Sequence, residues 1–347
     1  MTLDPARRPL SPRGMRRRRE RPGGASALRI ITRRLLVLPL VLLAIAAMTF
    51  LLVALSPFDP ASAYTSPSSG TSEQTRREIL AAWDLDGSML SQFGHWLGNL
   101  VRGDLGNSRL LAGQPVAQEI AARALPSVVL VLTALALVLV GGLVLGVLAA
   151  AFRDSLLDWT VRTLCYYGTA APSFWIGLLL LSVFSIQLGW LPSGGSIDVR
   201  SADAAFIDPA HLILPAITLA ITQQSWFTLF VRDTLLEVLR EDYVRYAEAS
   251  GVHRTAVLAR HALPNALIPF ITLTGSHLAE LIGGAVLAET IFAWPGVGRL
   301  TVEAALVVDL PLLVAITLLG AVLVVLGNLV ADLLYRVADP RIREGLT

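Results

Sequence analysis

The chain has 347 residues, of which 54% are hydrophobic and only 16% are charged, so it is far more apolar than a water-soluble globular domain. This composition excludes an ordinary soluble fold and indicates that a membrane is the solvent. The formal net charge of +2 says little by itself, because orientation in a membrane depends on where the cations lie. We expect no nucleic-acid partner.

Six stretches are long and apolar enough to form spanning helices, each of which needs about 20 residues. The expected spans are Leu35–Leu55, Pro126–Phe152, Thr163–Leu188, His211–Val231, Leu267–Phe292 and Leu312–Tyr335. The first run is too long for a secretory signal peptide, and no good small-residue cleavage site follows it. The sequence therefore predicts an all-α polytopic membrane protein with six transmembrane helices.

The basic residues are unevenly distributed between the loops. All 28 cations are arginines, and 21 of them lie in the N-terminal tail, in 153–162, in 232–260 or in the C-terminal tail. Because positive charge is enriched on the cytoplasmic side, this asymmetry places both termini in the cytoplasm, which agrees with an even number of spans.

This topology divides the chain into four parts. Residues 1–34 form a basic cytoplasmic tail that we expect to be disordered near anionic headgroups, and 35–55 form the first transmembrane helix, followed by an extracytoplasmic loop, 56–125. Residues 126–335 form a five-helix core that includes a cytoplasmic loop, 232–264, and 336–347 form a C-terminal tail. In the outer loop, Phe93, Trp96, Leu97, Leu100 and Val101 recur at helical spacing, which indicates a short helix that either packs on the outer mouth or forms a docking surface.

The cytoplasmic loop 232–264 predicts two helical segments separated by Gly251. Leu235, Val238, Leu239 and Tyr243 form an apolar stripe on the first segment, and a positive φ at Gly251 can end it. Pro264 leads back into the bilayer. Such a helix–turn–helix can enter a groove on a partner and transmit motion as a rigid body.

The same loop resembles a family signature. Its pattern, E-A-A, three residues, G, nine residues, I, one residue, L-P, fits without gaps. The glycine is Gly251, the final pair is Leu263-Pro264, Arg245-Tyr246-Ala247 stands at the opening triplet, and His261 stands at the Ile position.

Other stretches resemble the same family in the same order. They are Trp96–Leu100 with Arg102–Gly106, Pro172–Trp175, Leu236–Arg245, Glu289–Phe292 with Trp294–Gly298, and Asp332–Tyr335 with Asp339–Arg343. Together they resemble the membrane permeases of binding-protein-dependent ABC importers, in the dipeptide and oligopeptide branch.

The resemblance implies a type I ABC importer permease fold in a multi-pass protein of the bacterial cytoplasmic membrane. It also implies a second, homologous permease subunit, two ABC ATPase subunits, an extracytoplasmic solute-binding protein and a peptide substrate. The residues implied to couple the permease to the ATPases are Arg245, Tyr246, Ala247, Gly251, His261, Leu263 and Pro264. The chain lacks a G-x-x-x-x-G-K-[ST] phosphate loop, so we expect no catalytic residue and no cofactor in it, with ATP and Mg on the ATPases.

Two polar pairs in the spans are candidates for the translocation path. His277 and Glu280 share one face of the fifth span, where an ionisable group costs about 2.5–3.5 kcal/mol on insertion scales. They either meet the cargo, form a buried hydrogen-bonded pair or contact the partner permease; two ligands on one face make a poor metal site. Gln223 and Gln224 in the fourth span need an interior or wet environment.

Two further features have competing interpretations. The turn with Trp294, Pro295, Gly296 and Gly298 follows the fifth span and faces outward, which indicates an outer gate or docking turn, although a tryptophan there is ordinarily an interface anchor. Cys165 is the single cysteine, so an intramolecular disulfide is excluded, and a small core residue is the expected role.

Several functions remain open. Permeases of the same branch carry nickel chelates, glutathione or oligosaccharides, and nothing in the sequence separates these cargoes from peptides. A self-sufficient secondary carrier or channel is a second class, although we find no convincing internal repeat. An intramembrane enzyme is a third, and the spans hold no nucleophile with a base and no paired metal motif.

Overall fold

The computed structural model describes residues 24–55, 88–108, 110–111, 113–196 and 207–338. This part of the chain consists of helices and turns, with one isolated β-bridge between Asn107 and Pro115. Residues 1–23 of the expected N-terminal tail 1–34, residues 339–347 of the expected C-terminal tail 336–347, and most of the outer loop before Ser88 lie outside it. Residues 24–34 and 336–338 are helical and continue the neighbouring apolar helices, so the expectation of disorder for 24–34 is wrong.

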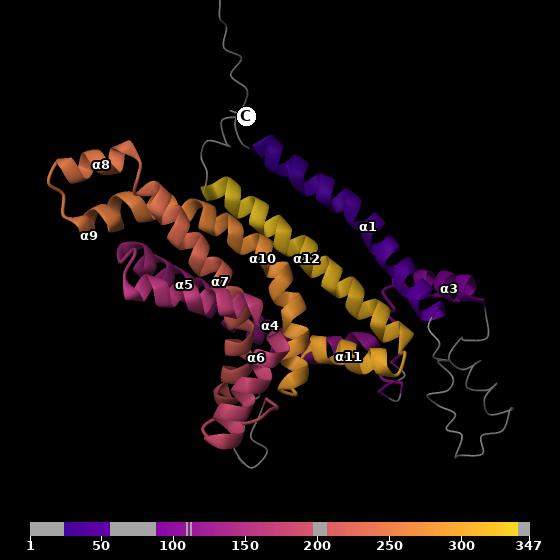
Figure 1. Ribbon diagram of the computed structural model, residues 1–347. Helices are drawn as coiled ribbons and strands as arrows, with labels where there is room; N and C mark the ends of the chain where they lie inside the picture. Colours follow the sequence, from indigo (N-terminus) through magenta and orange to yellow (C-terminus); the bar gives the residue numbers. More distant parts are fainter. Residues whose placement is uncertain (1–23, 56–87, 109, 112, 197–206, 339–347) are drawn as a thin grey trace, which may run out of the picture.

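The helices follow one another along the chain in the order shown in Figure 1. Their bounds are α1 Gly24–Ala54, α3 Met89–Val101, α4 Val116–Ala151, α5 Leu156–Ala170, α6 Ser173–Leu180, the π-helical η2 Leu181–Gln187, α7 Pro209–Val238, α8 Asp242–Ala249, α9 Arg254–Ala256, the π-helical η3 Val257–Ala262, α10 Leu263–Ile291, α11 Val297–Leu306 and α12 Leu310–Ala338.

The expected spans are all helical, and one of them is broken. Four described helices are long and apolar enough to cross a membrane: α1 over Ile31–Val53, α4, α7 and α12 over Leu310–Val330. The pair formed by α5 and α6–η2 makes a fifth such segment. The remaining expected span, the fifth along the chain, lies almost entirely within the 29-residue α10, which is long enough but is not among these apolar candidates.

The third expected span is not the continuous helix that the sequence predicted. It bends by 109° between Ala170 and Ser173. The cause is Pro172, because a proline disfavours the helical conformation of the residue before it and lacks the amide proton of the helix ladder. Ala171 accordingly adopts an extended conformation, with φ −77° and ψ 133°.

Helices α4 and α7 pack most extensively against each other. Their close approach depends on glycines of α4, since small residues let backbones come together in a membrane. A Cβ atom on Gly142 would lie 2.8 Å from Cβ of Phe227, and one on Gly146 would lie 2.7 Å from Cβ of Val231. A core of Leu130, Ala134, Leu219, Leu281 and Trp294 joins this pair to α10.

The expected helix of the outer loop is α3. Its residues Phe93, Trp96, Leu97 and Leu100 pack with Ala46 and Phe50 of α1 and with Leu310 and Val314 of α12, and the rings of Phe50 and Phe93 lie 5.2 Å apart. Val101, which the sequence assigned to the same stripe, is exposed. The apolar face of α3 is therefore occupied by packing within the chain.

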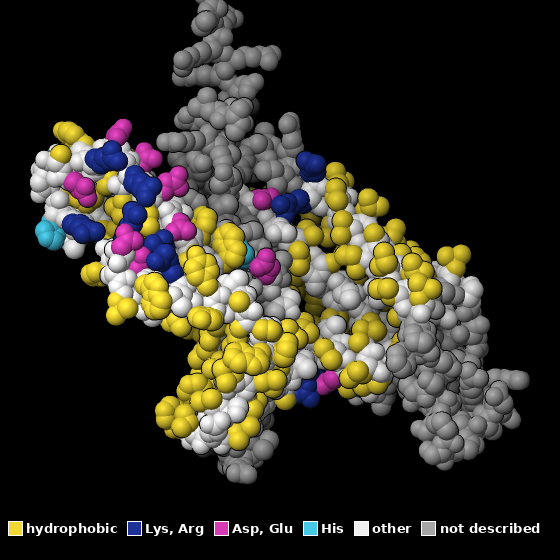
Figure 2. Space-filling model, in the orientation of Figure 1, with side chains coloured by type: hydrophobic (Ala, Val, Ile, Leu, Met, Phe, Trp, Pro, Cys, Tyr) yellow, Lys and Arg dark blue, Asp and Glu magenta, His cyan; other side chains and the backbone are white. Residues whose placement is uncertain are grey.

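The start of α1, the end of α12 and the loop carrying α8 and α9 lie at one end of the molecule (Figure 1). Charged side chains gather around α8 and α9, whereas apolar side chains cover the projecting arm formed by α6 (Figure 2). This distribution agrees with the expected topology, in which both termini and the loop 232–264 share the cytoplasmic side.

Candidate functional site

The loop 232–264 contains the two helical segments predicted on either side of Gly251, but the first segment is interrupted. Helix α7 runs out of the apolar region to Val238, a turn follows at 239–241, and α8 then starts at Asp242. Leu235 therefore belongs to the same helix as the fourth span, and Tyr243 belongs to α8. Only three residues therefore separate α8 from α7, so a displacement of α8 acts almost directly on α7.

Gly251 closes α8 with a φ of 84°. The amide of Gly251 donates to the carbonyl of Glu248 at 3.0 Å and that of Val252 donates to Ala247 at 3.2 Å, which satisfies carbonyls that the end of the helix leaves open. A Cβ at Gly251 would meet nothing within 4 Å. Glycine is therefore required here by backbone conformation and not by space.

Helix α8 has one buried and one exposed face. Val244 and Ala247 pack with Val257 of η3 and against Val238 and Leu239. On the opposite face Arg245 is exposed, and Tyr246 is 76% exposed. An aromatic ring and a guanidinium held outward on a supported helix form a surface suited to enter a groove of another protein.

The other predicted loop residues form the base of this projection. The carbonyl of His261 accepts from the Asn265 side-chain amide at 3.0 Å and from the Tyr243 hydroxyl at 3.3 Å. Leu263 is partly buried, and Pro264 stands at the first turn of α10. The π-helical turn η3 ends at Ala262, two residues before this proline, which lacks the amide proton for an α-helical hydrogen bond.

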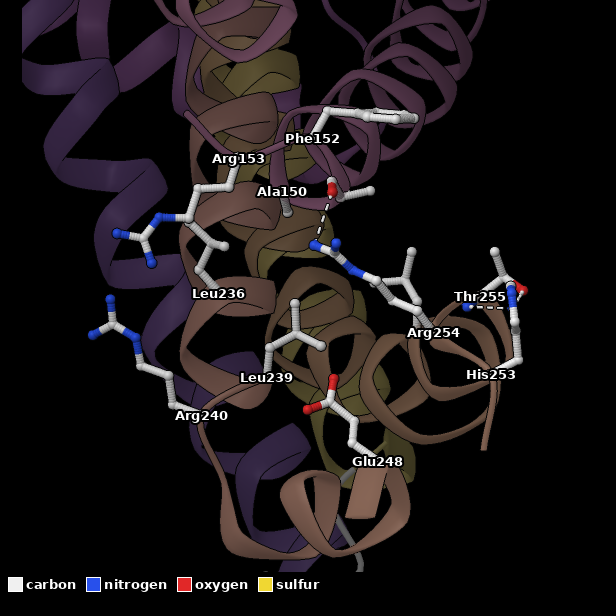
Figure 3. Close-up of a pocket in the computed structure, with 12 residues that line it drawn as sticks. Ala150, Phe152, Arg153, Leu236, Leu239, Arg240, Glu248, His253, Arg254 and Thr255 are labelled. Atoms are coloured by element: carbon white, nitrogen blue, oxygen red, sulfur yellow. Dashed lines mark hydrogen bonds between the residues drawn. The ribbon is translucent and has the colours of Figure 1, made fainter. Parts of the chain in front are cut away.

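A cleft of about 580 Å³ separates α8 and α9 from the ends of α4 and α7 (Figure 3). Its apolar floor includes Leu236, Leu239 and Leu258, and Arg254 crosses it to donate to the carbonyl of Ala151 at 3.3 Å. Glu248 points into the cleft, whose opposite side carries Arg153 and Arg240 (Figure 3). The cleft joins parts of the chain that the sequence analysis treated separately.

A buried ion pair that the sequence analysis missed joins α5 to α7. The Arg232 guanidinium donates to both carboxylate oxygens of Asp158, at 2.7 Å and 2.9 Å, and Asp158 is fully buried. Asp158 also accepts from the amide of Asp154 at 3.0 Å. The sequence signal was two opposite charges at the ends of neighbouring spans. Such charges are expected to pair, because an unpaired charge in an apolar environment is costly.

The structure joins His277 and Glu280 and places them beside α7. The His277 Nδ1 atom lies 2.8 Å from Glu280 Oε2, and the His277 ring lies 4.9 Å from the ring of Trp226 and 5.3 Å from that of Phe227. His277 itself is buried, but the Glu280 side chain is 60% exposed and Trp226 is 48% exposed. The two side chains therefore form a hydrogen-bonded pair in which the histidine is buried and the carboxylate is exposed.

The two glutamines in α7 do not join this cluster. Gln224 donates to the hydroxyl of Thr228 at 3.0 Å, and its amide lies over Gly141 of α4. Gln223 is half-buried. Gln224 thus satisfies its amide in the contact between α4 and α7, which favours a packing role for it.

The outer turn contains a buried tryptophan, so the interface-anchor interpretation of Trp294 is wrong. Trp294 is fully buried, and its indole N–H donates to the carbonyl of Pro126 at 3.0 Å. Within the turn Gly296 is buried and Pro295 and Gly298 are half-buried, which leaves Ala293 as the exposed residue. The buried Trp294 ring and its hydrogen bond to Pro126 therefore hold the turn against α4.

Glu289 explains the glycines of this turn. Its carboxylate is buried and accepts from the Ser127 hydroxyl at 2.6 Å and from the amide of Arg299 at 3.0 Å. A Cβ on Gly296 would overlap that carboxylate, and one on Gly298 would lie 2.7 Å from Cα of Val286. The carboxylate thus stabilises the start of α11, where backbone amides lack partners.

Cys165 is buried, as expected of a small core residue. Among the described residues, no three His, Cys, Asp or Glu side chains are grouped in a way that could hold a metal ion.

Two family comparisons match the chain. Residues 142–344 match the family described as "Binding-protein-dependent transport system inner membrane component", and residues 27–112 match its N-terminal companion. The chain belongs to this family. It is therefore the membrane-spanning component of a binding-protein-dependent transport system, as the order of motifs around Gly251 predicted.

Curated relatives cover nearly the whole chain. An oligopeptide transport system permease of Bacillus subtilis is 39% identical over 313 residues, which span 90% of this chain and 98% of that protein. A putative peptide transport system permease of Brucella abortus is 41% identical over 303 residues, 87% of this chain and 95% of the relative. A glutathione transport system permease of Escherichia coli is 36% identical over 318 residues, 91% and 99% of the two chains.

Solved structures support the fold independently. Two inward-facing crystal forms of the MetNI methionine ABC transporter contain a chain that is similar to this one, with TM-scores of 0.51 and 0.54 and identities of 17% and 16%. Each similarity covers 64% of this chain and 97% of the other. The permease thus has the all-α fold of an ABC importer permease.

Proposed function

We propose that this permease pairs with a second, homologous permease and two ATPase subunits to import peptides across the bacterial cytoplasmic membrane. ATP and Mg are bound by the ATPases, and the permease itself carries no catalytic site. An extracytoplasmic binding protein delivers the cargo. The observation that carries the proposal is the projecting α8, whose exposed Arg245 and Tyr246 stand on a base built from α7, η3 and α10.

Peptide is the proposed cargo because two relatives, 39% and 41% identical to this chain, are named for peptide transport. Glutathione, itself a small peptide, is the second candidate, since the Escherichia coli relative is named for it. Nickel chelates and oligosaccharides have no such support among these relatives.

Reconstitution tests the assembly. The tagged permease, purified from the cells that produce it, should copurify with a second permease and ATPases. Liposomes containing the complex should take up a labelled oligopeptide only with ATP and binding protein. Uptake by liposomes that contain this chain alone, driven by an ion gradient, would instead identify a secondary carrier.

We further propose that Glu280 and Trp226 face the cargo, because their side chains are exposed next to a buried histidine in an otherwise apolar region. A carboxylate there attracts the free amino group of a peptide. Glu280→Gln should raise the concentration needed for half-maximal uptake of a free peptide, with little effect on an N-acetylated one. An equal change for both peptides would indicate a packing role.

A further inference from the structure

A pocket of about 460 Å³ lies between the inner ends of α1 and α12, away from α8 and from Glu280. It is lined by Arg33, Arg34, Val37, Leu38, Val41, Val325 and Asp332. The pocket has a charged end and apolar walls, both built from two membrane-spanning helices.

The charges in this pocket do not cancel. Arg34 Nη2 lies 2.5 Å from Asp332 Oδ2, which forms one ion pair between α1 and α12. Arg33 has no ion-pair partner among the described residues and is exposed. Two guanidinium groups against one carboxylate leave one positive charge, which a phosphodiester with its single negative charge would neutralise.

The charged end stands at the membrane boundary. The apolar segment of α1 starts at Ile31 and that of α12 ends at Val330, so Arg33, Arg34 and Asp332 all lie within a few residues of the edge of the hydrocarbon region. Figure 2 shows acidic and basic side chains together at this end of α1, above a flank of apolar ones. Among the apolar side chains of α1, Leu36 is 79% exposed and Leu40 is 68% exposed, as expected of side chains that face lipid.

We propose that this pocket binds an anionic phospholipid of the inner leaflet. The phosphate pairs with Arg33 and the free donors of Arg34, and an acyl chain lies along Val37, Leu38, Val41 and Val325. Inorganic phosphate fits less well, because it leaves the apolar walls exposed to water. This site is independent of the transported cargo and of the assembly with ATPases.

Native mass spectrometry of the full-length permease in detergent tests the proposal. Phosphatidylglycerol and phosphatidylcholine are titrated separately into the wild type and into Arg33→Gln, Asp332→Asn and Arg153→Gln. Arg153 is the matched control, because it is an exposed arginine at the end of α4, on the same side of the membrane.

We expect the wild type to retain phosphatidylglycerol in preference to phosphatidylcholine. Arg33→Gln should weaken phosphatidylglycerol retention about fivefold, the effect of removing one arginine near a membrane surface. Asp332→Asn should strengthen it, since Arg34 is then free to bind the phosphate, and a merely destabilised fold would not produce this opposite sign. Arg153→Gln should change nothing.

Three results would overturn the proposal. Equal retention of both lipids would show an apolar groove without headgroup recognition. An equal loss in Arg153→Gln would show general attraction to the basic surface. Displacement of phosphatidylglycerol by millimolar inorganic phosphate alone would show that the site binds a free anion.

Discussion

At the scale of single residues, Gly251 and Gly296 are required for different reasons. Gly251 has a φ of 84° and open space around it, so a side chain there strains the backbone. Gly296 has an ordinary extended conformation, with φ −100°, but its missing side chain leaves room for the Glu289 carboxylate. The first glycine orients the projecting loop, and the second lets a buried charge support the outer turn.

Gly251→Ala should uncouple ATP hydrolysis from uptake without preventing membrane insertion. Holding alanine in the left-handed region costs about 1–2 kcal/mol, so α8 shifts relative to its base. The measurement is peptide uptake per ATP hydrolysed in liposomes. Gly94→Ala is the control, because Gly94 lies inside α3 with nothing within 4 Å. Unchanged coupling in Gly251→Ala would show that the loop tolerates another backbone conformation.

Gly296→Ala should destabilise the outer turn. The new methyl group displaces the Glu289 carboxylate from Ser127 and from the amide of Arg299, and a buried polar group without partners costs about 1–3 kcal/mol. Thermal unfolding in detergent measures the loss. Gly320→Ala, a helical glycine with open space around it, should leave the midpoint unchanged or raise it. A similar midpoint for both variants would mean that the carboxylate relocates at no cost.

At the scale of elements, α7 connects the loop to the rest of the fold. It continues into the turn before α8, packs along α4 through Gly142 and Gly146, and holds α5 through Arg232. Because α5 leads across the 109° bend into α6, the ion pair links the loop to the arm that α6 forms. These contacts connect the turn before α8 to α4 and α5 and, through α5, to α6.

A double-mutant cycle measures this link. Asp158→Leu or Arg232→Met alone should destabilise the protein by less than the roughly 3–5 kcal/mol of a fully unpaired buried charge. Each removes the two-bond partner of a buried charge, but Arg232 keeps Asp233 at 2.7 Å and Asp158 keeps Arg162 at 3.4 Å. The double variant should recover much of the loss, since an apolar pair fills the same space without unpaired charge. If the two single losses simply add, the residues act independently and the pair does not join α5 to α7.

At the scale of the whole molecule, charge and hydropathy set the orientation. The loop with α8 and α9 and the inner ends of α1 and α12 share one side, and α11 with the outer turn lies at the other end of α10 and α12 (Figure 1). Tyr246 is 76% exposed on the first side, and Leu306, at the end of α11, is 78% exposed on the second.

Cysteine labelling tests this topology. In a Cys165→Ser background, a membrane-impermeant maleimide should label Leu306→Cys in intact cells, and it should label Tyr246→Cys only after the membrane is opened. Cys165 is buried, so it contributes little labelling of its own, and the Cys165→Ser background removes that small signal. Labelling of Tyr246→Cys from outside would show that the permease has the opposite orientation to the one assigned here.

The sequence alone determined the membrane class, the apolar segments that form helices and the family, because apolar run length and the motif around Gly251 and Leu263-Pro264 are local patterns. The break at Pro172 was also readable locally, yet hydropathy alone predicted one straight span, since proline does not interrupt an apolar run.

The tertiary structure alone decided which polar groups from distant segments are paired. Arg232 and Asp158 are 74 positions apart, and Trp294 reaches a carbonyl 168 positions away, so only the packing of α4, α5, α7 and α10 brings them together. It likewise decided that Trp294 is core, that Gln224 lies against α4 and that Arg33 lines a pocket with α12. The physical reason is that burial and pairing depend on neighbours in space, and neighbours from distant segments leave no spacing pattern in the chain.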